Sequence, residues 1–117
     1  MVKRILVPLD PSPYSNSAVK TACHLAKVHA AEVTGLVILD VPGIEQSIGP
    51  VPLGASHYAD HLEKHKVDEA EQMIHGLLTA FKKWCVKAGV RHREAEFQGS
   101  PSDSIIRQSR LYDLTVM

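Results

Sequence analysis

The chain has 117 residues, of which 44% are apolar and 22% charged, the composition of one globular domain rather than of a disordered segment. Thirteen lysines and arginines balance thirteen aspartates and glutamates, so the chain lacks the concentrated positive charge that non-specific nucleic-acid binding needs. No apolar run approaches the roughly 20 residues that cross a bilayer, and two cysteines make no disulfide framework. We therefore expect a cytoplasmic protein that binds neither nucleic acid nor membrane.

The first expected element is a buried strand over residues 2–10, with the apolar core Ile5–Pro8. A turn follows, and Ser12 as N-cap with Pro13 in the first helical position predicts the start of a helix. This helix runs to about residue 30, and the spacing of its residues predicts one face that packs closely against a sheet. That face holds Ala18, Ala22, Leu25, Ala26 and His29.

A second strand is expected over residues 32–40, which are apolar at nearly every position. Continuous rather than alternating hydrophobicity predicts a parallel sheet covered on both faces. Residues 41–56 are rich in proline and glycine and predict a long irregular loop, a kind of segment that is often functional. A long helix follows from about residue 57 to residue 88 and ends at Gly89. Its apolar stripe is Leu62, Ala70, Met73, Ile74, Leu77, Phe81, Trp84, Cys85 and Ala88.

The last part of the chain predicts two more strands with a helix between them. Residues 90–98 alternate charged and apolar side chains, as a half-exposed edge strand does. Ser100 as cap and Pro101 begin a short helix, with Ile105 and Ile106 as its core contacts. Residues 111–117 form the fourth strand. The order of strands and helices predicts an α/β fold, a parallel sheet with helices on both faces.

Four segments in this order resemble the universal stress protein family, and the resemblance covers essentially the whole chain. They are Lys3–Asp10 before a serine-rich helix start, Leu36–Asp40, the Gly99–Pro101 turn with Ile105 and Ile106, and Asp113–Met117. The resemblance implies a Rossmann-like sheet with the strand order 3-2-1-4-5. It also implies, as in many members, a site for ATP or AMP where the strand order reverses.

The resemblance also implies which residues hold the cofactor. In the family's pattern the Asp after the first strand and main-chain groups at the end of the second hold adenine and ribose. The implied cofactor-binding positions are Pro8, Leu9, Asp10, Ile38 and Met117. The Asp10 carboxylate would accept a hydrogen bond from a ribose hydroxyl or an adenine amine.

Nucleotide-binding members continue from the fourth strand into a glycine-rich phosphate loop and a fifth strand, and those positions would follow Met117. We therefore expect residues 1–117 to form an incomplete domain of a longer or two-domain stress protein. We expect this chain to bind no nucleotide tightly. We also expect a homo-oligomer through the edge of the fourth strand at Leu114–Met117, or pairing with a second stress-protein domain.

Three functions compete. The first is a non-catalytic stress-response or signalling domain that responds to adenine nucleotides. The second is an oligomerising structural module of the same fold that binds no nucleotide. The third is an adenine-nucleotide α-hydrolase, whose loop after the first strand needs glycines; Asp10–Ser15 has none, and its two prolines remove N–H donors. We therefore expect that the protein is not an enzyme.

Other reactive side chains have structural interpretations. His57, His61 and His65 have the spacing that lets two histidines share a metal ion, but they lack a further ligand, so we expect a solvated face and no metal. The long helix is expected to bury Met73, Phe81, Trp84 and Cys85, and Cys23 is expected to be buried packing. Ser12, Ser15 and Ser17 are interpreted as caps and turn residues.

Overall fold

The computed structural model describes residues 2–40, 44 and 56–117. The elements are β1 (Arg4–Pro8), α1 (Pro13–His29), β2 (Glu32–Leu39), α3 (Ser56–Ala88), β3 (Arg91–Gln98), α4 (Pro101–Ser109) and β4 (Leu114–Thr115). The strands form one sheet in the order β3-β2-β1-β4, and each neighbouring pair is parallel. The predicted α/β fold is therefore confirmed. The predicted loop lies outside the described residues, apart from Ile44 and the first residue of α3.

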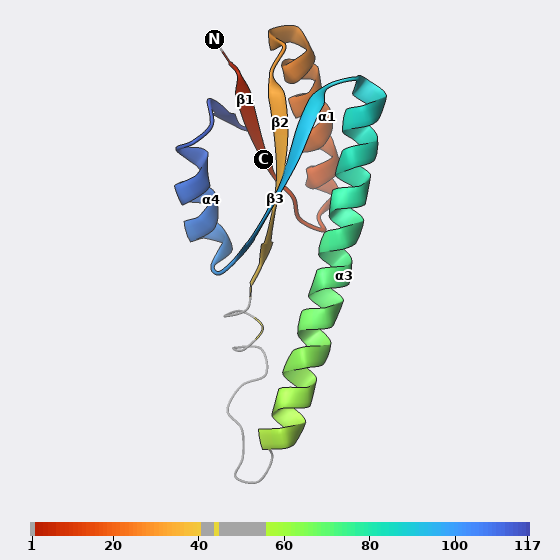
Figure 1. Cartoon of the computed structure of the whole chain (residues 1–117), viewed down its shortest axis with the longest axis vertical. Helices are drawn as coiled ribbons and strands as arrows, with labels where there is room; N and C mark the ends of the chain where they lie inside the picture. Colours follow the sequence, from red (N-terminus) through yellow and green to blue (C-terminus); the bar gives the residue numbers. More distant parts are fainter. Residues whose placement is uncertain (1, 41–43, 45–55) are drawn as a thin grey trace.

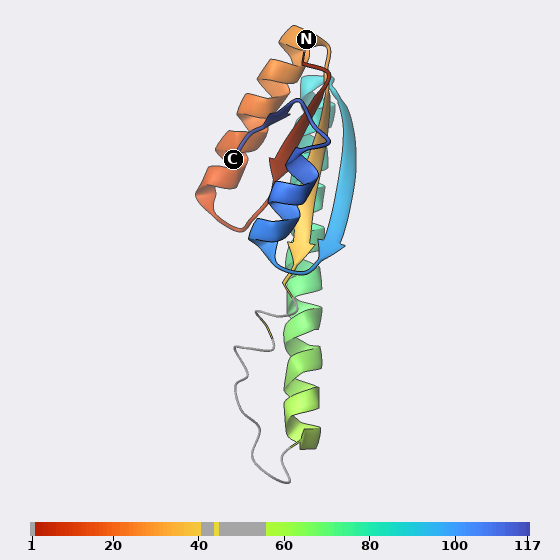
Figure 2. The same cartoon turned by 90° about the vertical axis from the view of Figure 1, so that its left-hand side faces the viewer.

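Helices cover both faces of the sheet, as predicted. Helices α1 and α3 lie on one face and α4 lies on the other (Figure 1, Figure 2). From β1 the chain steps outward to β2 and then β3, and α4 carries it back across to β4 on the other side of β1. Because parallel crossovers are right-handed, this reversal of direction puts α4 on the face opposite to α1 and α3. The strand order therefore reverses between β1 and β4.

The alternation of side chains along a strand explains why β1 and β2 are apolar at successive positions. Ile5 and Val33 pack with Phe81 of α3 in a core cluster that also contains the buried face of α1. Leu6 and Leu36 are at most 1% exposed, yet they are not part of that cluster. They therefore point to the α4 side, and the sheet buries apolar side chains on both of its faces.

Two glycines determine the position and length of α3. A Cβ on Gly35 of β2 would lie 2.8 Å from Cδ1 of Phe81, so the missing side chain lets the ring lie directly on the strand. The Phe81 ring also meets His92 of β3 edge-on, with 6.1 Å between the ring centroids. At the other end, Gly89 has φ +70°, the left-handed conformation that the sequence predicts for the end of this helix.

The starts of α1 and α4 differ from the prediction in one respect. Ser12 and Ser100 occupy the N-cap positions and prolines follow them, but neither hydroxyl makes a capping hydrogen bond. In α1 the reason is visible, because the Ser15 N–H that a cap would bind donates to the carbonyl oxygen of Ser12 at 3.2 Å. The predicted side-chain caps are therefore wrong, although the helix starts are right.

Three residues that we expected in the core are exposed. His29 lies at the end of α1, beside an open hollow at the amino end of the sheet. Ile106 is 58% exposed because Ile105 takes the side of α4 toward the sheet, and consecutive helical residues point about 100° apart. Met73 is 52% exposed because it borders a cavity. Trp84 is half-buried and packs against the edge of the core.

Hydrogen bonds attach β4 to the amino end of β1. Asp113 accepts bonds at Oδ2 from the N–H groups of Lys3 at 2.8 Å and Arg4 at 2.9 Å. These bonds lower the pKa of the Asp113 carboxyl, because they stabilise its charged form. The Arg4 guanidinium donates to the Leu111 carbonyl and lies 5.3 Å from the centroid of the Tyr112 ring. Residues 111 and 112 belong to a turn, so β4 is shorter than predicted.

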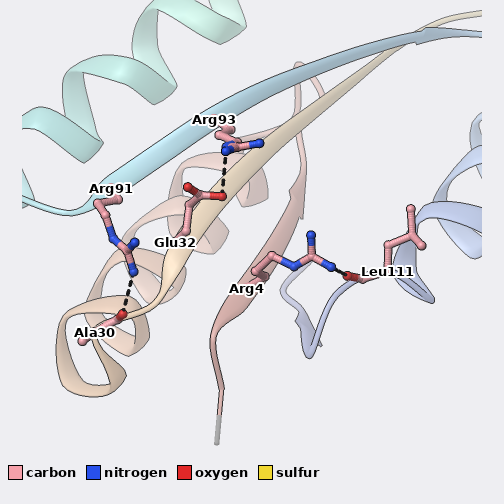
Figure 3. A network of polar contacts seen from close by, with 6 residues as sticks. All are labelled: Arg4, Ala30, Glu32, Arg91, Arg93 and Leu111. Atoms are coloured by element: carbon pink, nitrogen blue, oxygen red, sulfur yellow. Dashed lines mark hydrogen bonds and ion pairs between the residues drawn. The ribbon is translucent and has the colours of Figure 1, made fainter.

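The other arginines at this end join β3 to its neighbours. Arg91 donates to the carbonyl of Ala30 at 3.1 Å, and Arg93 pairs with Glu32 of β2 at 3.2 Å. Figure 3 shows these guanidinium groups and that of Arg4 directed at different acceptors. They therefore hold the strands together rather than converging on one anion.

Candidate functional site

A cavity of about 450 Å³ lies at the carboxyl ends of β1 and β2. Its lining includes Pro8, Leu9, Asp10 and Ile38, four of the five positions that the family resemblance implies. Met117, the fifth, lies outside this lining and is 79% exposed. The volume is in the range of sites that hold small molecules, and the carboxyl ends of parallel strands are where such sites form.

Asp10 is held by a local network at the mouth of this cavity. Its Oδ1 accepts a hydrogen bond from the N–H of Ser12 at 2.9 Å, and its own N–H donates to the Ser15 hydroxyl at 3.4 Å. The preceding N–H, that of Leu9, donates to the carbonyl of Leu36 at 2.8 Å. The backbone before Asp10 is thus fixed by β2 and the side chain by the turn after it. The exposed carboxylate keeps Oδ2 as an acceptor for a ligand.

Helix α3 forms a wall of the cavity that our sequence analysis assigned to the core. The wall includes Ala70, Met73, Ile74 and Leu77, which lie on one stripe of the helix. Ile74 is 8% exposed and packs with Val37 and Leu39, so its predicted core position is confirmed. The prediction missed the cavity beside this stripe, and the lengths of the elements contained a signal for it. A 33-residue helix is about 50 Å long, whereas an eight-residue strand is about 26 Å long. Part of the stripe must therefore extend past the sheet, where no strand can cover it (Figure 1).

The remaining lining residues give the cavity an apolar interior and an acidic rim. Ile105 and Pro101 of α4 contribute further apolar surface. The charged lining residues are Asp10, Asp40, Glu69 and Lys66, three carboxylates against one amine among the described residues. Glu69 also accepts a bond from the Nε2 of His65 at 3.0 Å. The interior suits a flat apolar group such as a nucleobase, and Asp10 suits a hydroxyl or an amine beside it.

The family model for universal stress proteins matches residues 1–117, the whole length of the chain. The chain belongs to the universal stress protein family. The resemblance drawn from four sequence segments is therefore confirmed, and the sheet order β3-β2-β1-β4 agrees with the family's order as far as β4.

Solved structures of this family share the fold. Universal stress protein UspA from Lactobacillus plantarum superposes with a TM-score of 0.74 at 20% identity, over 98% of this chain and 75% of its own. A family member from Burkholderia pseudomallei gives a TM-score of 0.75 at 18% identity, over 97% of this chain and 79% of its own. A universal stress protein in complex with cAMP gives a TM-score of 0.60 at 17% identity, over 97% of this chain and 70% of its own. Comparison with curated proteins gives no match.

Among the described residues of this universal stress protein, no helix is long and apolar enough to cross a membrane. The histidine cluster of the long helix is only partly described. His61 and His65 are exposed, and the side chain of His57 lies outside the described residues. Within the described part of the chain, no three His, Cys, Asp or Glu side chains are placed to hold a metal ion.

The two cysteines are buried, as predicted, and lie next to each other. Cys23 of α1 and Cys85 of α3 are 5% and 0% exposed. Burial raises the pKa of both thiols, that of Cys85 to about 12, because the charged thiolate is poorly solvated there. Both lie outside the cavity lining.

Proposed function

We propose that this universal stress protein domain binds the adenine and ribose of a nucleotide such as ATP or AMP in the cavity beside Asp10. The observation that carries the proposal is the placement of a fixed, exposed carboxylate at the mouth of an apolar cavity, at the carboxyl ends of the strands. The relative in complex with cAMP supports the class of ligand. The domain acts as a non-catalytic stress-response or signalling module in the cytoplasm.

The rim charge predicts which nucleotides bind better. A polyphosphate brings several negative charges to a rim with three carboxylates and one amine among the described residues. Like charges at such a rim repel, and salt weakens this repulsion only in part. We therefore expect ATP to bind weakly to this chain, and adenosine and AMP to bind no worse than ATP.

A phosphate-release assay tests the absence of a catalytic role. The described lining has no serine, threonine, cysteine or histidine, so carboxylates such as Glu69 and the amine of Lys66 are the groups there that could act as a base or nucleophile. Incubation of the purified chain with ATP should release no phosphate above the buffer rate. Release that disappears in Glu69→Gln would contradict this part of the proposal.

Calorimetric titration of the chain with adenosine, AMP and ATP tests the binding proposal. Asp10→Asn is the sharpest variant, because the amide oxygen can still accept the Ser12 N–H bond while the charge is lost. We expect about 1–2 kcal/mol weaker binding, the value of a charge-assisted hydrogen bond. The control Asp60→Asn removes an exposed carboxylate of α3 that lies outside the cavity lining and should leave the affinity unchanged.

Two outcomes would overturn the proposal. Equal affinity of Asp10→Asn and the parent chain would remove Asp10 from the site. The lack of heat with all three ligands at millimolar concentration would favour the alternative, a structural module that binds no nucleotide.

We also propose self-association through the β4 side of the sheet. Ile106, Leu111 and Met117 on this side are between 56% and 79% exposed, and within the described residues β4 pairs only with β1. A second copy or a second stress-protein domain would cover these side chains. Sedimentation equilibrium at tens of micromolar should show a dimer that Met117→Lys weakens. A species of 12.9 kDa alone would contradict it.

A further inference from the structure

The fold brings together two cysteines that are far apart in the sequence. Cys23 lies in the middle of α1 and Cys85 near the end of α3, 62 positions later. Their sulfur atoms are 3.9 Å apart, within the distance of a weak hydrogen bond between thiols. At that distance no other atom lies between them. The sequence spacing contained no sign of this pair.

We propose that Cys23 and Cys85 are an oxidation site, at which an intramolecular disulfide bond joins α1 to α3. The bond length of a disulfide is about 2.05 Å, so the sulfurs have to approach by roughly 1.9 Å. Rotation about the Cα–Cβ bonds provides part of this movement. The buried neighbours of Cys23 on α1 are Val19, Ala22 and Ala26, so the largest side chain beside the sulfur on its own helix is a valine.

The reaction needs an oxidant, for which hydrogen peroxide is a sufficient class. Peroxide first oxidises one thiol to a sulfenic acid and releases a water molecule. The second sulfur then displaces hydroxide from the sulfenic acid, which leaves as water with the proton of the second thiol. In total two S–H bonds break, one S–S bond forms, and two electrons and two protons reduce one peroxide to two waters.

Burial determines which thiol the oxidant reaches first and how fast the pair is oxidised. Cys23 retains 5% exposure whereas Cys85 has none, so Cys23 is the sulfur that a small oxidant reaches first. The raised pKa of both thiols keeps them protonated, so we expect slow oxidation that needs sustained exposure to the oxidant. Once formed, the bond is shielded from bulky reducing agents in the same way.

The disulfide would connect α1 to α3, the helix that carries a wall of the cavity. Helix α1 begins three residues after Asp10, and α3 carries the cavity wall. The inference nevertheless does not depend on nucleotide binding, because it rests on the distance and burial of two sulfur atoms.

The test is treatment of the folded chain with hydrogen peroxide at low protein concentration, followed by intact mass and peptide mapping without reduction. We expect a loss of 2 Da from the monomer, a crosslinked pair of peptides that contain Cys23 and Cys85, and a thermal midpoint higher by at least about 5 °C. The single variants Cys23→Ala and Cys85→Ala should lose the 2 Da change. Because Cys23→Ala removes one sulfur atom from a face that already holds Ala18, Ala22 and Ala26 beside Val19, this variant should also fold.

Three results would overturn the proposal. One is an unchanged mass after prolonged treatment of the folded chain. A second is a gain of 16 or 32 Da on one cysteine without a crosslink. The third is a crosslink that forms only in urea, since it would then belong to the unfolded chain.

Discussion

The two faces of the sheet are held by different interactions. On the face of α1 and α3, buried apolar side chains such as Ile5, Val33 and Phe81 form a continuous core. On the other face, α4 has no fully buried residue, and Ile106 is mostly exposed. The segment that contains α4 and β4 is attached to β1 by hydrogen bonds, including those that Asp113 accepts, and by Leu114 and Val116, which pack against the core.

Because of this difference, the two faces of the sheet contribute unequally to the stability of the fold and to the cavity. The apolar face fixes the position of β1 and β2, whose carboxyl ends form the floor of the cavity, and apolar burial is the main source of folding free energy. The α4 side contributes Ile105 and Pro101 to the cavity but little burial to the core. Substitutions on the two faces should therefore have clearly different effects on unfolding.

The largest expected effect comes from truncation of the central side chain of the α3 face. Phe81→Ala should lower the free energy of unfolding by about 4 kcal/mol, because it removes a fully buried ring and leaves a cavity. The matched variant on the α4 face, Ile106→Ala, should change it by about 0.5 kcal/mol or less. Urea unfolding followed by circular dichroism measures both. Equal losses would mean that the two faces are not held differently.

A smaller effect is expected from an added methyl group on the same face. Gly35→Ala places a carbon 2.8 Å from the Phe81 ring and should cost about 1–3 kcal/mol. In the control Gly76→Ala on α3, the new Cβ would have no described atom within 4 Å apart from its own turn of helix, and the change should stabilise the helix by about 0.5–1 kcal/mol. In the background of Phe81→Leu, the cost of Gly35→Ala should fall. An unchanged cost in that background would exclude the ring as its cause.

The sequence predicted the fold well because its strongest signals are local. Continuous apolar runs predicted the parallel strands, the prolines that begin α1 and α4 set two helix starts, and Gly89 set the end of α3. The errors occur where tertiary contacts determine whether a side chain is buried or which hydrogen bond forms. Periodicity predicted that Met73 and Ile106 are buried, but periodicity describes only the helix and says nothing of what lies opposite. The Ser12 cap is missing because the backbone carbonyl of Ser12 takes the Ser15 N–H that the hydroxyl would bind.

The site was predictable only on the strand side. There the family resemblance implied the position of Asp10, a polar residue directly after a buried strand at the carboxyl edge of the sheet. Prediction of the α3 wall would have required a comparison of element lengths. Prediction of the Cys23–Cys85 contact would have required knowledge of how two helices from distant parts of the sequence pack. Long-range contacts of this kind leave no local pattern.

The smallest expected effect tests the polar attachment on the α4 side. In the folded chain the pKa of Asp113 lies below its ordinary value of 3.8, because the N–H groups of Lys3 and Arg4 stabilise the carboxylate. A lowered folded-state pKa means that the stabilisation is present above the unfolded pKa and is lost as the pH falls through the folded one.

Asp113→Asn keeps a neutral acceptor but lacks the charge, so its thermal midpoint should lie slightly below that of the parent near pH 6. The two midpoints should converge as the pH falls through the lowered folded-state pKa, because the parent's carboxyl is then protonated as well. Asp60→Asn on the exposed side of α3 serves as the control and should follow the parent throughout. A gap of constant size from pH 6 to pH 2 would show that the charge of Asp113 does not attach β4 to β1.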